Sequence, residues 1–346
     1  MTGPRSTERD VPRSNDRDVP PARGVVPARP ELGGGAATPS FASDADPAWR
    51  PPAGRRPDRP APAPTTIGGR RFDWGSRTYV MGILNVTPDS FSGDGLLGAG
   101  GAGAADLAGR ALALARRLVD EGADLLDVGG ESSRPGHPVV DAAEETRRVV
   151  PIVAALHAAL PDVPISVDTI KPSVAEAALD AGASLLNDVW GVAPDGALAG
   201  IAAERGVSIV LMHNRAEARY DDLVGEVLAE LGAAVARARA AGVPESAIIV
   251  DPGFGFGKAP VHNLALLAGL ERFHELGRPI LLGASRKSTL GKVLDLPPDE
   301  RLEATLATTA LAVHAGVDIV RVHDVRPNVR VARMVDAVVR GWESAP

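Results

Sequence analysis

The chain has 346 residues, a net charge of −7 and no cysteine. The lack of cysteine excludes disulfides and thiolate metal sites, and a reducing cytoplasm is the expected location. The negative net charge does not suggest the basic surface that binding to a nucleic acid requires. No apolar run reaches the length of a membrane span, so no membrane partner is expected either.

Residues 1–65 differ in composition from the rest of the chain. They hold 14 of the 30 prolines, with Gly, Ser, Arg and Asp interspersed and no apolar periodicity. Such a segment cannot bury enough apolar surface to offset the entropy that it loses on ordering. It has neither the apolar core of a signal peptide nor the acid-poor composition of a transit peptide. We predict a disordered extension over 1–65, of unassigned role, and a folded domain over 66–346.

Eight short apolar runs in the folded part are typical of buried parallel strands. In chain order they are 79–84, 125–128, 165–167, 185–186, 208–211, 248–250, 280–282 and 319–322. Segments rich in Ala, Leu and Arg with helical periodicity lie between and after them. These predicted helices are 104–121, 142–160, 173–181, 196–205, 223–241, 263–276, 301–315 and 328–341.

This alternation, with no antiparallel hairpin signal, predicts an α/β fold of the (β/α)8 barrel type. The fourth unit is the weakest, because Asp168 and Asn187 lie only 19 residues apart. A doubly wound open sheet is the alternative. It would usually carry a G-x-G-x-x-G turn after the first strand, and residues 86–89, Val-Thr-Pro-Asp, are not such a turn.

A polar residue closes every predicted strand. Because a barrel of this type places its reaction site at the C-terminal ends of the strands, these residues are expected at one mouth. They are Asn85, Asp127, Asp168, Asn187, His213, Asp251, Ser285 and His323. Asn, Asp and Ser also favour turns and helix caps, so a single member of the set could be structural. The whole set, flanked by Gly and Pro, predicts a site.

Lysine is scarce beside the 33 arginines, and the chain has only Lys171, Lys258, Lys287 and Lys292. A lysine in a loop after a strand is therefore a mild indication that a compact ammonium group is needed there. Codon bias and chance explain any one of them equally well.

Eight motifs occur along the chain in this order: TYVMGILNVTPDSFS (78–92), DVGGESSRPG (127–136), SVDTIKP (166–172), ND (187–188), LMH (211–213), DPGFGFGK (251–258), GASRKS (283–288) and RVHDV (321–325). Together they resemble dihydropteroate synthase of the folate pathway, over residues 67 to 340. The second and sixth motifs are individually specific. The resemblance implies a (β/α)8 barrel that condenses 6-hydroxymethyl-7,8-dihydropterin diphosphate with p-aminobenzoate, releases pyrophosphate and requires Mg²⁺.

The resemblance also assigns roles around the pterin diphosphate. Asp251 would accept the N3–H and the 2-amino group of the pterin edge, and Lys287 would donate to its 4-oxo and N5 acceptors. Arg321 and His323 would hold the diphosphate. The full set is Asp127, Asp168, Asn187, Met212, Asp251, Phe256, Lys287, Arg321 and His323. The catalytic groups among the matched residues are Asp127, Arg134, Lys287, Arg321 and His323.

Asn85 is the implied Mg²⁺ ligand, since this ion needs few protein oxygens when phosphates and water complete its shell. Zinc at His213 and His323 is not predicted, because no third ligand clusters with them. The p-aminobenzoate pocket is expected from Phe91, Ser133, Arg134, Pro135 and Ser288. Asp94 lies one residue beyond the position usual in the family, so its equivalence stays open.

The chemistry expected of such a site is displacement at a CH₂ group on an electron-rich ring. A developing cation can delocalise into the pterin, so an SN1-like path is expected, with Mg²⁺ and arginine stabilising the departing diphosphate. Two other functions stay open: a pterin-binding methyl-transfer barrel with a cobalamin partner, and a paralogue that binds pterin without turnover. Family members are typically homodimers through outer helices, and the same is expected here.

Overall fold

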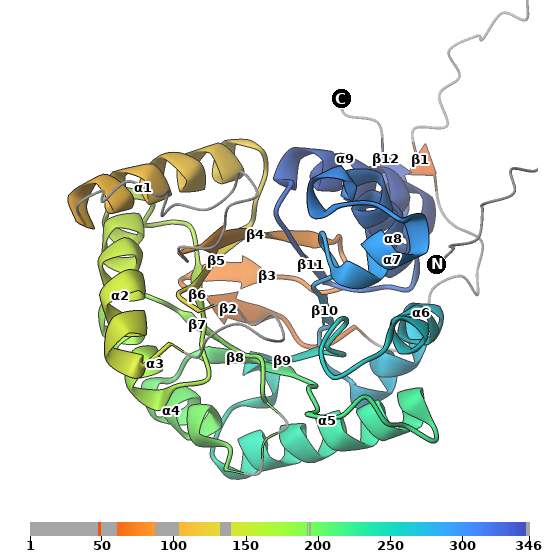
Figure 1. The fold of residues 1–346 in the computed structure, drawn as a ribbon, viewed down its shortest axis with the longest axis horizontal. Coiled ribbons are helices and arrows are strands. Elements are labelled where there is room, and N and C mark those ends of the chain that lie inside the picture. The colour runs from red at the N-terminus through yellow and green to blue at the C-terminus, as the bar shows by residue number, and fades with distance from the viewer. Residues whose placement is uncertain are drawn as a thin grey trace, which may run out of the picture. The chain divides into compact units, whose positions relative to one another are not determined.

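The computed structural model describes residues 48–49, 61–86, 104–131, 140–191, 193 and 195–343, and Figure 1 shows their fold. Contacts divide the chain into Met1–Ala45 and Asp46–Pro346, and every described residue belongs to the second unit. Most of the segment predicted to be disordered lies outside the described residues, so that expectation stays a prediction.

A sheet of eight parallel strands forms the centre of the molecule. Its order, β10-β11-β4-β5-β6-β7-β8-β9, brings the first and last members together, and a bridge between Val250 and Ile280 joins β9 to β10. The strands are β4 (Tyr79–Asn85), β5 (Leu125–Gly129), β6 (Ile165–Asp168), β7 (Leu185–Asp188), β8 (Ser208–Met212), β9 (Ile248–Asp251), β10 (Leu281–Leu282) and β11 (Ile319–Val322). The predicted barrel is confirmed, and the open sheet is excluded.

Helices surround this sheet on the outside (Figure 1). They are α1 (Ala104–Asp120), α2 (Ala142–Ala159), α3 (Pro172–Asp180), α4 (Ala197–Arg205), α5 (Leu223–Ala240), α6 (Pro260–Ala268), α7 (Ser288–Leu294), α8 (Leu302–His314) and α9 (Val325–Val339). The short α3 explains how the tight fourth unit still makes a crossover. The helix predicted over 263–276 is instead α6 and a separate 3-10 helix, Leu270–Leu276, because the α-helix ends at Gly269. Among the described helices, none is long and apolar enough to cross a membrane.

The structure also contains an antiparallel hairpin, which no signal in the sequence predicted. Strands β2 (Thr65–Ile67) and β3 (Arg70–Phe72) pair antiparallel around a Gly68-Gly69 turn. Three-residue strands are too short to show the alternation that reveals a hairpin in sequence. Ile67, Phe72 and Trp74 join the cluster of side chains inside the barrel. The hairpin lies across the centre of the ring in Figure 1 and fills its N-terminal end.

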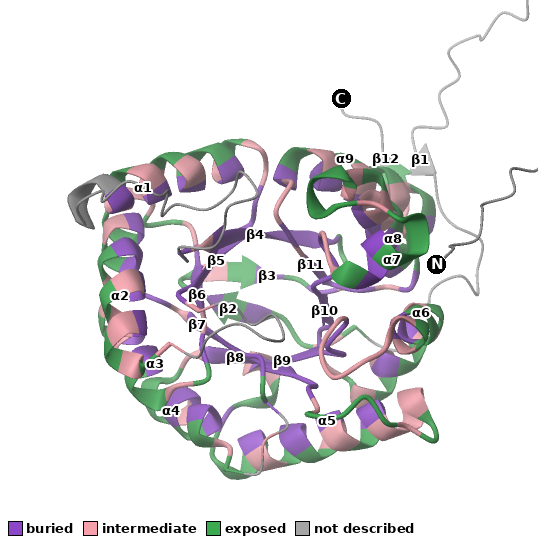
Figure 2. Ribbon diagram, viewed as in Figure 1, coloured by how far each residue is buried: buried purple, intermediate pink, exposed green. Residues whose placement is uncertain are grey.

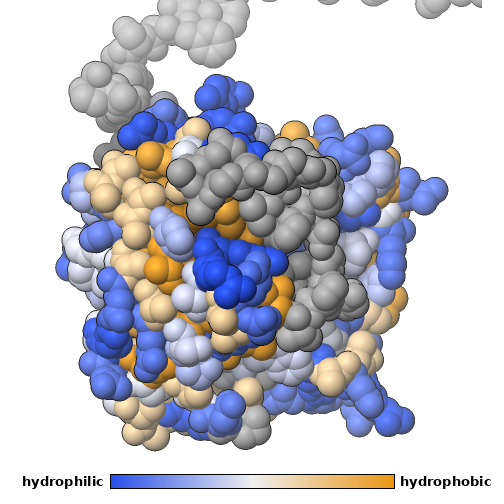
Figure 3. All heavy atoms as spheres, turned by 60° about the vertical axis from the view of Figure 1, so that its left-hand side comes forward, coloured by the Kyte–Doolittle hydropathy of each residue, from blue (hydrophilic) through white to orange (hydrophobic). Residues whose placement is uncertain are grey.

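Two apolar layers hold the barrel together. One fills its interior, and the larger one lies between the sheet and the helices. Figure 2 shows the strands almost wholly buried and the outer helix faces exposed, as expected for parallel strands covered on both sides. On the face turned forward in Figure 3, hydrophilic residues lie among hydrophobic ones.

A separate two-stranded sheet joins distant parts of the chain. β1 (Ala48–Trp49) pairs antiparallel with β12 (Trp342–Glu343).

Candidate active site

Arg321, in β11, joins side chains from two other strands across the mouth of the barrel. Its Nε lies 2.6 Å from Oδ2 of Asp127 in β5, and its Nη2 lies 2.9 Å from Oδ2 of Asp168 in β6. Asn187 of β7 donates to the same oxygen of Asp127 at 3.2 Å. Four of the residues predicted for the pterin site are therefore in one hydrogen-bonded group.

The two acids of this group differ from exposed carboxylates: Asp168 has a raised pKa and Asp127 has an unpaired buried oxygen. Burial raises the pKa of Asp168 to about 7, an effect that Arg321 opposes and Asp127 increases. Asp127 is fully buried, and its Oδ1 has no hydrogen-bond partner in the part of the chain that the structure describes. A buried oxygen without a partner is costly, and it is an acceptor that a ligand donor can use.

Asp251 begins the glycine-rich turn after β9. Its Oδ1 accepts a hydrogen bond from the backbone N–H of Gly253 at 2.7 Å, and burial raises its pKa. Gly253 has a φ of +74°, and a Cβ there would stand 1.8 Å from the carbonyl oxygen of His213. Asp251 is thus a turn residue, yet its Oδ2 makes no hydrogen bond within the described chain and remains available to a ligand.

Lys287 lies over this turn from the loop before α7. Its Nζ donates to the carbonyl oxygen of Phe254 and stands 4.0 Å from the ring centroid of Phe256. A Cβ on Gly255 would come within 2.6 Å of the Lys287 side chain, so the lysine needs a glycine beneath it. Burial lowers the pKa of Lys287 to about 7, although the charge of Asp251 opposes the shift.

His213 does not face the mouth, so its predicted place there is wrong. Its side chain is fully buried, with Nε2 3.1 Å from Glu230 of α5 and Nδ1 2.9 Å from Nζ of Lys258. Neighbouring residues of an extended chain point to opposite sides, and Met212 precedes His213 at the end of β8. Burial and the Lys258 charge lower the pKa of His213 to about 4, so it is neutral at pH 7.

Lys258 supports the glycine-rich turn from the side opposite the mouth, a role that the sequence did not reveal. Its Nζ donates to the carbonyl oxygens of Gly253 and Phe256, each at 3.1 Å. Burial lowers the pKa of Lys258 to about 7. The turn is therefore held by one lysine on each side.

The ends of β10 and β11 are tied to each other. Oγ of Ser285 accepts the backbone N–H of His323 at 3.2 Å and lies 3.0 Å from its Nδ1. The next residue, Arg286, forms a two-point ion pair with Asp324 at 2.7 and 3.0 Å. His323 is thereby fixed two residues beyond Arg321, and Ser288 is exposed at the start of α7.

Asn85 ends β4 beside Asp168. A Cβ built on Gly129 would stand 3.9 Å from Oδ1 of Asn85 and 3.8 Å from Oδ2 of Asp168. Two oxygens thus border a space that the glycine leaves open. No cluster of three His, Asp or Glu side chains suited to a metal occurs in the described chain. Four predicted p-aminobenzoate contacts lie outside the described residues, namely Phe91, Ser133, Arg134 and Pro135.

Lys171 links the second and third βα-loops, and sequence reasoning noted it only for its rarity. Its Nζ is paired with Glu131 and lies 2.5 Å from Oε2 of Glu145, which is 1% exposed. Glu131 also accepts the backbone N–H of Val140 at 2.9 Å. This group therefore brings together the chain leaving β5 and the chain approaching α2.

Comparison with known proteins agrees with this geometry. Residues 81–323 match the family model of the pterin binding enzymes. The dihydropteroate synthase of Bacillus subtilis is 51% identical over 263 residues, 76% of this chain and 89% of that protein. That of Clostridium beijerinckii is 48% identical over 79% of this chain and 99% of its own. A Xanthomonas albilineans dihydropteroate synthase solved with 4-aminobenzoic acid has a TM-score of 0.74 and 41% identity, covering 80% of this chain and 98% of its own.

The fold and the polar mouth therefore define a pterin-binding enzyme built on a (β/α)8 barrel. Within that class, the chain belongs to the dihydropteroate synthase family and has its transferase activity.

Replacing Lys171 tests the link between the loops. In Lys171→Met, Glu145 stays buried without its counter-charge, so the free energy of unfolding in urea should fall by about 3 kcal/mol. Lys171→Arg should lose less, and the added change Glu145→Gln should recover part of the loss. As the control, Arg205→Met breaks the exposed pair with Asp180 and should cost less than about 1 kcal/mol. Equal losses in the two methionine variants would contradict a buried link.

Proposed function

We propose that this chain condenses 6-hydroxymethyl-7,8-dihydropterin diphosphate with p-aminobenzoate, giving 7,8-dihydropteroate and pyrophosphate. The observation that carries the proposal is the meeting of Asp168, Asn187, Asp251 and Lys287 at one mouth. Arg321 lies between the acids of that mouth, and its charge acts on both Asp168 and Asp251. Paired acceptors beside two cations suit a heterocycle that carries donors on one edge and a diphosphate on the other.

In the proposed pterin pocket, Asp251 receives the donors of the ring edge. Its free Oδ2 and the second lone pair of its Oδ1 are the acceptors, and the Gly253 N–H fixes their direction. Lys287 donates to the acceptors of the ring, while Phe256 and Met212 pack against its faces. Asp127, Asp168 and Asn187 complete the polar wall.

Arg321 and His323 are proposed to hold the diphosphate. The guanidinium group already faces the mouth, and Ser285 sets the orientation of the imidazole ring. Phosphate commonly binds near the last two strands of such barrels. The charge of the diphosphate would also favour the cationic form of Lys287, whose pKa burial has lowered.

The residues at the mouth fit Mg²⁺. Oδ1 of Asn85 and Oδ2 of Asp168 border the open space over Gly129, and such oxygens are the ligands that this ion prefers, together with substrate phosphate and water. Asn85 is the proposed protein ligand. When bound, Mg²⁺ would neutralise charge on the leaving diphosphate.

The reaction needs little acid–base chemistry from the protein. A dissociative displacement is proposed, since the reduced ring can share the positive charge of its CH₂ group, and the arylamine is already neutral at pH 7. The side chains then contribute by holding the pterin and stabilising the diphosphate as it leaves. Oγ of Ser285 lies 3.0 Å from Nδ1 of His323, and in this proposal that contact orients the imidazole ring rather than activating a nucleophile.

The acceptor is proposed to bind between the first two loops and α7. The Xanthomonas albilineans relative, solved with 4-aminobenzoic acid, supports this choice of substrate. Ser288 begins α7, where a hydroxyl and a backbone N–H can meet a carboxylate. Phe91, Ser133, Arg134 and Pro135 remain proposed contacts from their motifs, with Arg134 kept as a catalytic candidate. A cytoplasmic location also remains a prediction.

A homodimer is proposed through the outer faces of α6, α7 and α8, of which α6 contacts the other two. Large apolar side chains are exposed there: Val261, Leu264, Val293, Leu294 and Leu311, between 45% and 68%. Exposed apolar patches of this kind mark protein interfaces, and the same surface on a second copy would cover this one.

Pyrophosphate release tests the function. With both substrates and Mg²⁺, the protein should release pyrophosphate and form dihydropteroate in equal amounts, and omitting p-aminobenzoate or adding a chelator should stop the reaction. Coupled phosphate detection and mass spectrometry measure the two products. Pterin binding without release would indicate a non-catalytic paralogue, and methyl transfer to cobalamin would indicate the other alternative.

The lowered pKa of Lys287 predicts the pH dependence of catalysis. The ammonium group is lost as pH rises through about 7, so kcat/KM for the pterin diphosphate should fall above that pH. Lys287→Met should lower kcat/KM at pH 6.5 by roughly 10- to 100-fold, the loss of a charge-assisted hydrogen bond. It should also remove the alkaline fall. Lys292→Met, on the exposed side of α7, is the control, and a retained alkaline fall in Lys287→Met would assign it to another group.

Charges placed on the proposed dimer surface should separate the subunits. Leu264→Glu combined with Val293→Glu should yield monomers by light scattering, because each charge would be buried in an apolar interface. Met334→Glu with Val338→Glu places the same charges on the exposed face of α9 and should leave the dimer intact. A monomeric unmodified protein would contradict the proposal.

A further inference from the structure

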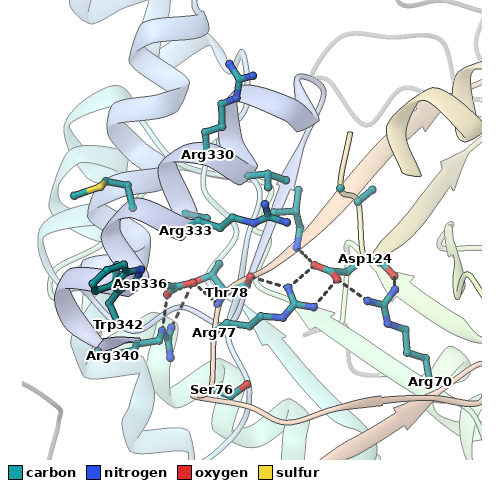
Figure 4. Close-up of a pocket in the computed structure, with 18 residues that line it drawn as sticks. Arg70, Ser76, Arg77, Thr78, Asp124, Arg330, Arg333, Asp336, Arg340 and Trp342 are labelled. Carbon is teal, nitrogen blue, oxygen red and sulfur yellow. Dashed lines mark hydrogen bonds and ion pairs between the residues drawn. The ribbon is translucent and has the colours of Figure 1, made fainter. Parts of the chain in front are cut away.

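A second pocket lies at the end of the barrel opposite the reaction site. It has a volume of about 1020 Å³ and is bounded by α9, β12 and the N-terminal ends of β4 and β5 (Figure 4). Five arginines and two aspartates are among its lining residues: Arg70, Arg77, Arg330, Arg333, Arg340, Asp124 and Asp336. This lining carries an excess of three positive charges, in a chain whose net charge is −7.

Both aspartates are already fully engaged. Asp124 accepts Arg70 at 2.7 Å, Arg77 at 2.6 and 2.9 Å, and the backbone N–H of Val80 at 2.9 Å. Asp124 is 5% exposed, so no room remains around it for a further cation. It fixes two guanidinium groups at one wall of the pocket.

Asp336 acts in the same way on the opposite wall. It accepts the backbone N–H of Thr78 at 2.7 Å, its hydroxyl at 3.0 Å, and Nε of Arg340 at 2.6 Å. Neither carboxylate can therefore neutralise the two arginines that α9 adds.

Those two arginines, Arg330 and Arg333, make no ion pair within the described chain. Figure 4 shows them extending from α9 with no interaction marked to the other lining residues. With Arg326 they occupy positions i, i+4 and i+7, on one face of the helix. Like charges at this spacing destabilise a helix. Among the described residues, Arg326 alone of the three has an ion-pair partner, Glu121 at 4.0 Å.

We propose that this pocket binds a phosphate anion with two or more negative charges. Guanidinium groups match phosphate oxygens in two-point pairs, and those of Arg330 and Arg333 make no ion pair within the described chain. Arg70 and Arg77, which Asp124 holds in place, add positive charge beside them. The anion could come from free pyrophosphate or from a nucleotide. The exposed indole of Trp342 at the rim offers a stacking surface to a base in the second case.

Calorimetric titration of the full chain with pyrophosphate tests the proposal. Besides binding at the reaction site, a second binding event should appear, and Arg330→Gln with Arg333→Gln should weaken that event at least tenfold. Turnover should be unchanged, since neither residue belongs to the reaction site. Arg116→Gln with Arg117→Gln, exposed on α1, removes the same charge elsewhere and should keep both events.

Two results would overturn the site. One is an equal loss in both double variants, which would mean nonspecific attraction. The other is a second event that the Arg330 and Arg333 substitutions leave unchanged. A titration of the unmodified protein that shows no second event would overturn the site as well. Titration with ATP separates the two sources. Tighter ATP binding that weakens in Trp342→Ala supports a nucleotide, whereas equal ATP and pyrophosphate affinities that are insensitive to Trp342→Ala support the free anion.

Discussion

The candidate site at the barrel mouth depends on one largely buried arginine, Arg321, that lies between acids. Moving a charge from water into a protein interior costs several kcal/mol, and the mouth holds three largely buried carboxylates, on Asp127, Asp168 and Asp251. Arg321 contacts the first two directly and its charge acts on the third. Because these groups project from strands rather than from loops, their mutual geometry is fixed by the barrel itself.

Two lysines, Lys258 and Lys287, donate hydrogen bonds to the glycine-rich turn after β9, and their surroundings differ. Lys258 faces His213 and the backbone behind the turn, where its hydrogen bonds to carbonyl oxygens hold the chain in place. Lys287 faces Asp251 and the mouth. Burial lowers the pKa of both to about 7, so their protonation responds to what lies beside them. Lys287 lies on the side of the mouth, where a bound anion would favour its charged form, and such binding would then change the charge of the candidate site.

The sequence revealed the barrel because its strands are buried on both sides and read as continuous apolar runs between helices. The structure has Asp168, Asn187 and Asp251 at the C-terminal ends of their strands, as predicted, because the apolar run before each of them marks where its strand ends. The rule that strand ends face the mouth gave a wrong position for His213, because successive side chains of an extended chain point to opposite sides. Lys171 was not assigned a role because ion pairs between distant residues, such as Glu131 and Glu145, leave no local pattern.

Aspartates at the two ends of the barrel show what separates a structural carboxylate from one that serves a ligand. At the N-terminal end, Asp124 and Asp318 are buried, and each of their oxygens accepts from the backbone or from an arginine nearby. At the mouth, Oδ1 of Asp127 and Oδ2 of Asp251 have no such partner within the described chain. Burial is similar at both ends, so burial alone does not identify a site. A buried acceptor left unpaired is destabilising unless something else completes it, and at the mouth a pterin with adjacent donors would do so.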